Sequence, residues 1–130
     1  MTNTELEQDL LSQLAQEKIH LRKYELNPIQ LQNIASLIAA SDYTLKSISF
    51  SYSKIEDAGL LTVLPSFPSS IYEIGLVGCE LTDASGEQLL AKIKLLPHLS
   101  MLCIEQNRFS QHLKNKFLAY GKSQQILVIV

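Results

Sequence analysis

A pattern of apolar residues that recurs every 24 to 28 residues constrains the fold of this 130-residue chain more than any other feature. When each repeat is numbered from its first apolar residue, positions 1, 4, 6 and 11 are apolar, and position 9 is small or polar in the clearest copies. Those three copies start at Leu45, Ile71 and Leu99, a looser one starts at Leu21, and a fragment starts at Ile126. Repetition at this spacing is typical of stacked supersecondary units, so we expect one structural unit per repeat.

Each repeat changes its period partway through. Positions 4 and 6 are two residues apart and therefore lie on one side of a short strand. After position 11 the apolar residues are three or four apart, as in Leu113 and Phe117, and this spacing indicates an amphipathic helix. Thr82 and Ser110 directly follow position 11 in their repeats and are suitable N-cap residues. The predicted fold class is α/β, with about four strand–helix units.

The residues at position 9 complete a known motif. The third repeat, IYEIGLVGCELTDASGEQLLAKI, has Cys79 where the leucine-rich repeat LxxLxLxxN/CxL has Cys or Asn, and the fourth repeat has Asn107 there. The pattern resembles leucine-rich repeats, and the period and helical second half resemble the ribonuclease-inhibitor-like subfamily. The second repeat departs from the motif with Ser53, and the first departs further with Ile29. The resemblance implies a short solenoid with parallel strands on a concave face and helices on a convex face.

The N-terminal segment does not follow the repeat. Leu6, Leu10, Leu11 and Leu14 lie on one face of a helix predicted over residues 4–18, which we expect to cover the open end of the first unit. The expected organisation is a single domain over residues 1–130. Its parts are the cap helix in residues 1–20, repeats over 21–44, 45–70, 71–98 and 99–125, and a terminal strand over 126–130.

The run Ile126–Val130 is apolar on both faces and predicts a fifth strand. Two interpretations of this strand stay open. In one, the preceding helix partly covers it. In the other, its free edge pairs with a second copy of the chain to form a homodimer, because an unpaired strand edge readily accepts another strand.

The two cysteines have different expected roles. Cys79 is expected to face inward at the bend after its strand, as an inert small side chain. Cys103 is expected on the concave face, and pairing with His98 or His112 would make the chain a small thiol-dependent enzyme. A disulfide between the two cysteines is not expected, because they point to opposite sides and are offset by roughly 13 Å along the strand direction.

Other chemical signatures do not form recognised motifs. Gly75, Gly78 and Gly86 lack the neighbouring residues of a phosphate-binding loop, and the histidines and cysteines lack the spacing of metal ligands. We therefore expect no cofactor, no metal and no catalytic residue.

Bulk composition narrows the partners and the compartment. A net charge of −2 and a pI near 5.9 give no electrostatic reason to expect nucleic acid. No apolar run reaches the roughly 18–20 residues of a membrane span, and residues 1–18 do not read as a secretion signal. The expected localisation is cytoplasmic, with both thiols free and no membrane insertion.

Outward-facing strand positions and their neighbours form the candidate binding surface. The array is mixed in charge with small polar residues at its centre, which disfavours nucleic acid and favours a protein or peptide. Its members are Arg22, Lys23, Glu25, Lys46, Ser49, Ser51, Tyr52, Tyr72, Glu73, Met101, Cys103 and Glu105.

The predicted function is therefore a non-enzymatic protein–protein interaction module. Family resemblance offers two settings for it, an adaptor or a bacterial effector delivered into a host cell. The alternatives are a thiol-dependent enzyme that uses Cys103, and a structural assembly subunit that pairs through Ile126–Val130.

Overall fold

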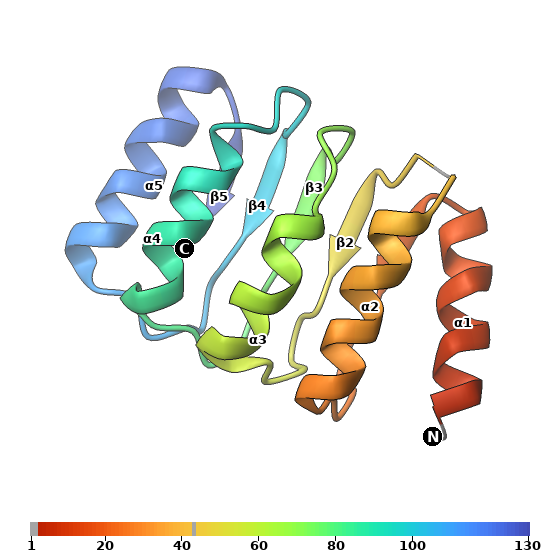
Figure 1. Ribbon diagram of the computed structural model, residues 1–130. Coiled ribbons are helices and arrows are strands. Elements are labelled where there is room, and N and C mark those ends of the chain that lie inside the picture. Colours follow the sequence, from red (N-terminus) through yellow and green to blue (C-terminus); the bar gives the residue numbers. More distant parts are fainter. Residues whose placement is uncertain (1–2, 43) are drawn as a thin grey trace.

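A computed structural model describes residues 3–42 and 44–130 of the chain. In these residues, short parallel strands form one sheet in the order β1-β2-β3-β4-β5, and helices connect them (Figure 1). The strands are β1 (Lys18–His20), β2 (Ser47–Ser49), β3 (Glu73–Gly75), β4 (Met101–Cys103) and β5 (Leu127–Ile129). The helices are α1 (Asn3–Ala15), α2 (Pro28–Ala40), α3 (Glu56–Val63), the 3-10 turn η1 (Leu64–Ser66), α4 (Asp83–Ile93) and α5 (Gln111–Gln124).

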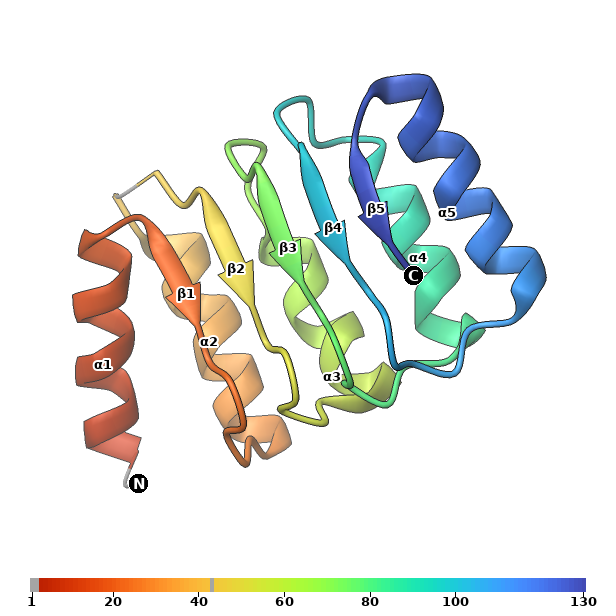
Figure 2. The ribbon, with the colours of Figure 1, turned by 180° about the vertical axis from the view of Figure 1, so that it is seen from behind.

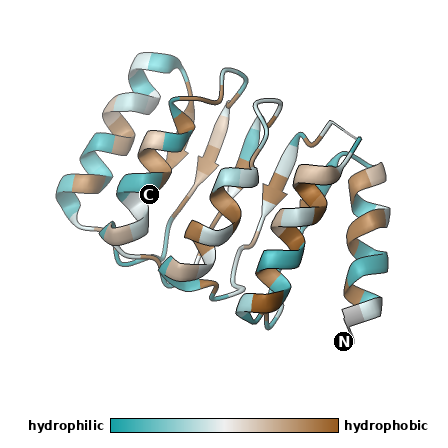
Figure 3. Ribbon diagram, viewed as in Figure 1, coloured by the Kyte–Doolittle hydropathy of each residue, from teal (hydrophilic) through white to brown (hydrophobic). Residues whose placement is uncertain are grey.

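Helices α2 to α5 all lie on one face of the sheet, and the described residues place no helix over the opposite face (Figure 2). This follows from the two periods in each repeat, because the strand and the helix that follows it bury their apolar sides against each other. Apolar and hydrophilic residues alternate along the helices accordingly (Figure 3). The mixed α/β class and the parallel strands predicted from the sequence are confirmed.

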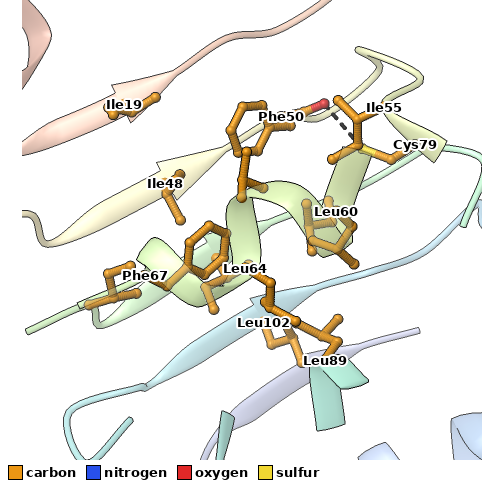
Figure 4. Close-up of a cluster of buried hydrophobic side chains, with 14 of the residues drawn as sticks. Ile19, Ile48, Phe50, Ile55, Leu60, Leu64, Phe67, Cys79, Leu89 and Leu102 are labelled. Carbon is orange, nitrogen blue, oxygen red and sulfur yellow. Dashed lines mark hydrogen bonds between the residues drawn. The ribbon is translucent and has the colours of Figure 1, made fainter. Parts of the chain in front are cut away.

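The core lies between the sheet and the helices. At position 4 of the repeats, Ile48, Ile74 and Leu102 are paired across neighbouring strands and are fully buried. Phe50, at position 6, reaches into the same layer and lies beside residues of α3 and η1 (Figure 4). The predicted inward set of the three clearest repeats is therefore correct.

The first repeat starts at Gln16, five residues before the predicted start at Leu21. Ile19 of β1 pairs with Ile48 of β2, so Ile19 occupies position 4 and Leu21 occupies position 6. Both side chains are fully buried, whereas Tyr24 is only half-buried. The predicted alignment failed because Leu21, Tyr24 and Leu26 repeat the apolar spacing of the motif, and only pairing with β2 distinguishes the two alignments.

The fifth strand is also offset from its prediction, by one residue. Val128 pairs with Leu102, so position 4 is Val128 and the repeat starts at Gln125 instead of Ile126. Since side chains alternate along a strand, this offset turns Leu127 and Ile129 away from the helices and toward the uncovered face. They are 54% and 39% exposed.

Helix α1 covers the β1 end of the sheet, as expected of a cap. Leu6, Leu10 and Leu14 are buried, but Leu11 is 48% exposed, so Leu11 does not belong to the buried face. The helix ends at Ala15, before the predicted end at residue 18, because β1 begins at residue 18. The Oε1 atom of Gln13 accepts a hydrogen bond from the backbone N–H of His20 (2.6 Å). This N–H lies at the outer edge of β1, so it is already bonded within the chain.

Position 9 ties each unit to the unit before it. In three successive repeats its side chain donates a hydrogen bond to the position 6 carbonyl of the preceding unit. The bonds run from Ser53 Oγ to Leu21 O, from Cys79 Sγ to Phe50 O at 3.1 Å, and from Asn107 Nδ2 to Leu76 O at 2.8 Å. The shared bond explains why Ser, Cys and Asn occur at one position.

Helix N-termini form a second contact that repeats between units. Asp57 accepts a hydrogen bond from the backbone N–H of Thr82 (2.8 Å), and Asp83 accepts one from the backbone N–H of Ser110 (2.8 Å). Thr82 and Ser110 are the N-caps of α4 and α5, as predicted, and accept hydrogen bonds from Ala84 and Leu113 respectively. These bonds hold successive helices in a common orientation.

Candidate functional site

The candidate site is the side of the sheet that faces away from α2 to α5, which we call the open face (Figure 2). Residues of β1 to β5 on this side alternate with the buried residues of the same strands. Two rows cross all strands, Lys18–Ser47–Glu73–Met101–Leu127 and His20–Ser49–Gly75–Cys103–Ile129. Backbone bonds such as Tyr52 N to Val77 O (2.7 Å) extend the ladder past the strand ends, so a third row follows, Arg22–Ser51–Val77–Glu105.

Most of the predicted site residues lie in or beside these rows. Ser49, Glu73, Met101 and Cys103 are strand residues, and Ser51, Arg22 and Glu105 belong to the third row. Lys46 and Tyr72 directly precede β2 and β3, and Tyr72 is 43% exposed. The structure thus brings together side chains from four units.

Two predicted members do not lie on the strand that was assigned to them. Lys23 and Glu25 were expected in the first strand, but β1 ends at His20 and both residues belong to the connection that leads to α2. Lys18 and His20 take their places in the array, and the sequence interpretation missed them. The usable signal was the pair Ile19 and Leu21, which supports the alternative alignment of the first repeat.

A chain of polar contacts crosses three strands of the open face. The Ser47 hydroxyl donates to Glu73 Oε1 (3.2 Å) and lies 2.8 Å from His20 Nε2. Burial, together with the Lys18 ammonium, lowers the pKa of His20, and the Glu73 carboxylate opposes this shift. The hydroxyl lies between the imidazole and the carboxylate, whereas an activated serine needs the imidazole between the other two groups. The chain orders side chains on the surface, and it does not have the geometry of an activated serine nucleophile.

Tyr52 is held in place by its neighbours. The Arg22 guanidinium carbon lies 4.7 Å from the ring centroid, and Gln106 Nε2 donates to the Tyr52 hydroxyl at 3.3 Å. A Cβ at Gly78 would lie 2.8 Å from the ring, and Gly78 has a φ of +61°. Glycine is needed at residue 78 for the approach of the ring more than for the backbone, because Tyr52 and Gln106 have nearly the same φ (63° and 61°) at the same position of their repeats. Tyr52 therefore connects Arg22 of the first unit with Gln106 of the fourth unit. Tyr72, which is exposed, is better placed to contact a binding partner.

The two thiols lie in the predicted places. Cys79 is fully buried, and burial raises its pKa to about 12. Cys103 is half-buried on the open face, where burial and the Glu105 and Glu73 carboxylates raise its pKa. A nucleophilic cysteine needs the opposite shift, toward the thiolate at neutral pH.

We expect both cysteines to react slowly with iodoacetamide at pH 7.5. Cys103 should react more slowly than a cysteine in an unstructured peptide, because its raised pKa leaves less thiolate. Cys79 should react only in denaturant. Mass spectrometry of wild type and of Cys103→Ser would follow the two sites separately, and alkylation of Cys103 faster than the peptide standard would support the thiol-enzyme hypothesis.

Other chemical features of the described residues are few. Within residues 3–42 and 44–130, no group of three or more His, Cys, Asp or Glu side chains is placed to hold a metal ion. The helices of this part of the chain are all too short or too polar to cross a membrane.

Fold and site together define a mixed α/β protein of stacked strand–helix units with one uncovered sheet face. A comparison with known proteins agrees with this class: 109 residues are 30% identical to a mouse (Mus musculus) protein named "NACHT, LRR and PYD domains-containing protein 5". The alignment covers 78% of this chain, which spans only 9% of the length of the mouse protein. No family model matches the chain. The similarity indicates a relation to leucine-rich-repeat proteins.

Proposed function

We propose that the chain is a non-enzymatic leucine-rich-repeat module that binds a protein or peptide on its open face. The observation that carries this proposal is the uncovered sheet face, on which five parallel strands present side chains without a helix over them. The named repeat content of the mouse relative also favours a protein-interaction role. No step of this function requires a cofactor or a metal.

Details of the units support the ribonuclease-inhibitor-like form of the repeat and a short solenoid. Each of the three clearest units has a strand, a turn with Ser, Cys or Asn at position 9, and an α-helix. The position 9 bonds join each unit to the preceding one in the same way, which is the nearest-neighbour contact that a solenoid needs. The adaptor and effector settings remain predictions.

A bulky charge at the centre of the open face should abolish binding without unfolding the chain. Ser49 is half-buried in β2, and Ser49→Arg would place a long side chain over the neighbouring Gly75. Capture from a lysate should recover a specific protein with the wild type and lose it with Ser49→Arg. Leu118→Arg, on exposed α5, is the matched control and should retain the partner. Equal capture by Ser49→Arg, with an unchanged circular dichroism spectrum, would contradict binding at the open face.

A second candidate function is assembly with another copy of the chain through β5. Leu127 and Ile129 are exposed at this edge, and β5 is paired with β4 alone. At the opposite edge, α1 lies against β1 and Gln13 binds the His20 N–H. Within residues 3–42 and 44–130, the β5 edge alone therefore resembles one that accepts a further strand.

The edge hypothesis predicts a mass that depends on concentration. In sedimentation equilibrium, wild type should rise from 14.6 kDa toward twice that value, and Leu127→Lys/Ile129→Lys should stay at the lower value. Lysines on an edge strand oppose pairing through their charge and hydration. Leu95→Lys/Leu118→Lys, which changes two exposed leucines elsewhere, should behave as wild type. A wild-type mass of 14.6 kDa at every concentration would show the hypothesis to be wrong.

A further inference from the structure

Charges on the open face are segregated by strand. Lys18 and Arg22 lie at the β1 end, and the carboxylates Glu73 and Glu105 lie on the third and fourth units. Serines of the second unit separate the two groups. The far end of the face, at β5, is apolar and exposed through Leu127 and Ile129. From β1 to β5, the open face therefore has a basic zone, an acidic zone and an apolar zone.

The opposite charges do not neutralise each other within the chain. Among residues 3–42 and 44–130 the ion pairs are Lys46–Glu17 and Lys116–Glu87, so Lys18, Arg22, Glu73 and Glu105 are in none. Lys18 and Glu73 are two strands apart in register, about 10 Å at the usual strand spacing. One oxygen of Glu105 is also inaccessible and has no hydrogen-bond partner in the described residues. Lys18, Arg22 and Glu73 therefore have no oppositely charged partner within the described residues, whereas the buried oxygen of Glu105 is out of reach of a partner.

The spacing of the three zones selects the shape of that partner. Glu73 lies two strand spacings from the basic zone at β1 and two from the apolar zone at β5, so each of these steps is about 10 Å. Glu105 belongs to the next unit and lies one spacing nearer to β5. One heptad of an α-helix rises about 10.5 Å and returns to the same face. An extended peptide repeats its face every 6.7 Å or so, and neither one nor two such steps fit. The zones therefore match a helix that lies across the strands.

We infer that the open face binds a helix of a partner protein that carries an acidic, a basic and an apolar side chain one heptad apart, with the acidic residue over β1 and the apolar residue over β5. This inference rests on the proposed function and specifies its ligand. The unpaired Glu73 and Glu105 would repel the phosphates of a nucleic acid laid along the same path. Contact with the apolar end uses Leu127 and Ile129, so the helix competes with any pairing through β5.

The test is selection from a display library of helical peptides about 21 residues long, which is three heptads. The invariant positions of each library peptide are mostly Ala and Gln, and one position in each heptad is randomised. Wild type should enrich peptides with an acidic residue in one outer heptad, a basic residue in the middle and an apolar residue in the other outer heptad. The order acidic, basic, apolar can run from the N-terminus or from the C-terminus of the peptide, because a helix can bind in either direction across the strands.

Charge reversal tests the orientation. With Lys18→Glu/Arg22→Glu the acidic preference should change to a basic one, and the best wild-type peptide should bind about tenfold more weakly at low salt, as expected for exposed ion pairs. Lys18→Glu alone keeps the contact between Arg22 and Tyr52 and should give a smaller change of the same sign. Lys94→Glu/Lys122→Glu, on the helical side, alters the net charge equally and should change neither preference nor affinity.

The outcomes separate this inference from the function on which it rests. If Ser49→Arg abolishes binding of the selected peptides but charge reversal leaves their acidic preference intact, the open face binds peptides and the inferred pattern is wrong. Enrichment of a different pattern that Ser49→Arg abolishes leads to the same conclusion. If the selected peptides bind Ser49→Arg as well as wild type, or if no peptide is enriched, peptide binding at the open face is itself contradicted.

Discussion

Asn107→Ala is expected to lower the free energy of unfolding by about 3 kcal/mol, since it leaves several buried backbone groups without partners. Asn107 Nδ2 donates to Leu76 O (2.8 Å) and Ile104 O (3.0 Å), and its Oδ1 accepts from the backbone N–H groups of Cys79 and Leu81 (both 3.0 Å). Alanine offers none of these bonds. Urea denaturation followed by circular dichroism measures the loss.

Two further substitutions make the Asn107 prediction specific. Asn107→Cys keeps a donor for Leu76 O, as Cys79 does for Phe50 O, and should lose less stability than alanine. Asn115→Ala removes an exposed amide on α5 that accepts from Gln111, and should change stability by about 0.5 kcal/mol or less. A loss for Asn107→Ala as small as that for Asn115→Ala would show that the position 9 bonds do not hold the units together.

Phe50→Ala is expected to lower the free energy of unfolding by about 3–5 kcal/mol, the usual cost of emptying a fully buried phenylalanine site. The ring fills the layer between β2 and α3, among residues contributed by several units (Figure 4). A cavity there removes contacts from the second and third units together. The measurement is the same urea titration, with the slope checked to confirm that the unfolding transition is unchanged.

Matched variants test whether the Phe50 effect arises from the cavity. Phe50→Leu restores much of the lost volume and should cost less than alanine. Leu118→Ala, at a residue that is 42% exposed on α5, should change stability only slightly. Equal losses for Phe50→Leu and Phe50→Ala would mean that the ring itself, and not the volume it fills, stabilises the core.

The sequence predicted the middle of the molecule well because its signals there are local and agree with each other. In the repeats that start at Leu45, Ile71 and Leu99, strand spacing, helix spacing and the position 9 residue point to one alignment. The N-caps Thr82 and Ser110 were predicted for the same reason, since a cap acts on its own helix. The open-face residues of these units were accordingly placed correctly.

The first unit was misplaced because two alignments satisfy the same local pattern. The run from Leu21 to Leu26 has the apolar spacing of a strand, but the backbone of Ile19 pairs with Ile48, which lies far along the chain. As a result, Lys18 and His20 were missed, and Lys23 and Glu25 were assigned to a strand that they do not form. A shift in register moves every side chain that depends on it.

By itself, the sequence determined the mixed α/β class and the inward residues of the central strands, because apolar periodicity acts over a few residues. Tertiary structure alone decided the register of β1 and β5, the exposure of Leu127 and Ile129, and the separation of basic from acidic residues on the open face. These features depend on which strand pairs with which and at what offset. Such pairing is settled by the burial of Ile19 and the partial burial of Val128 against other elements, which no local pattern specifies.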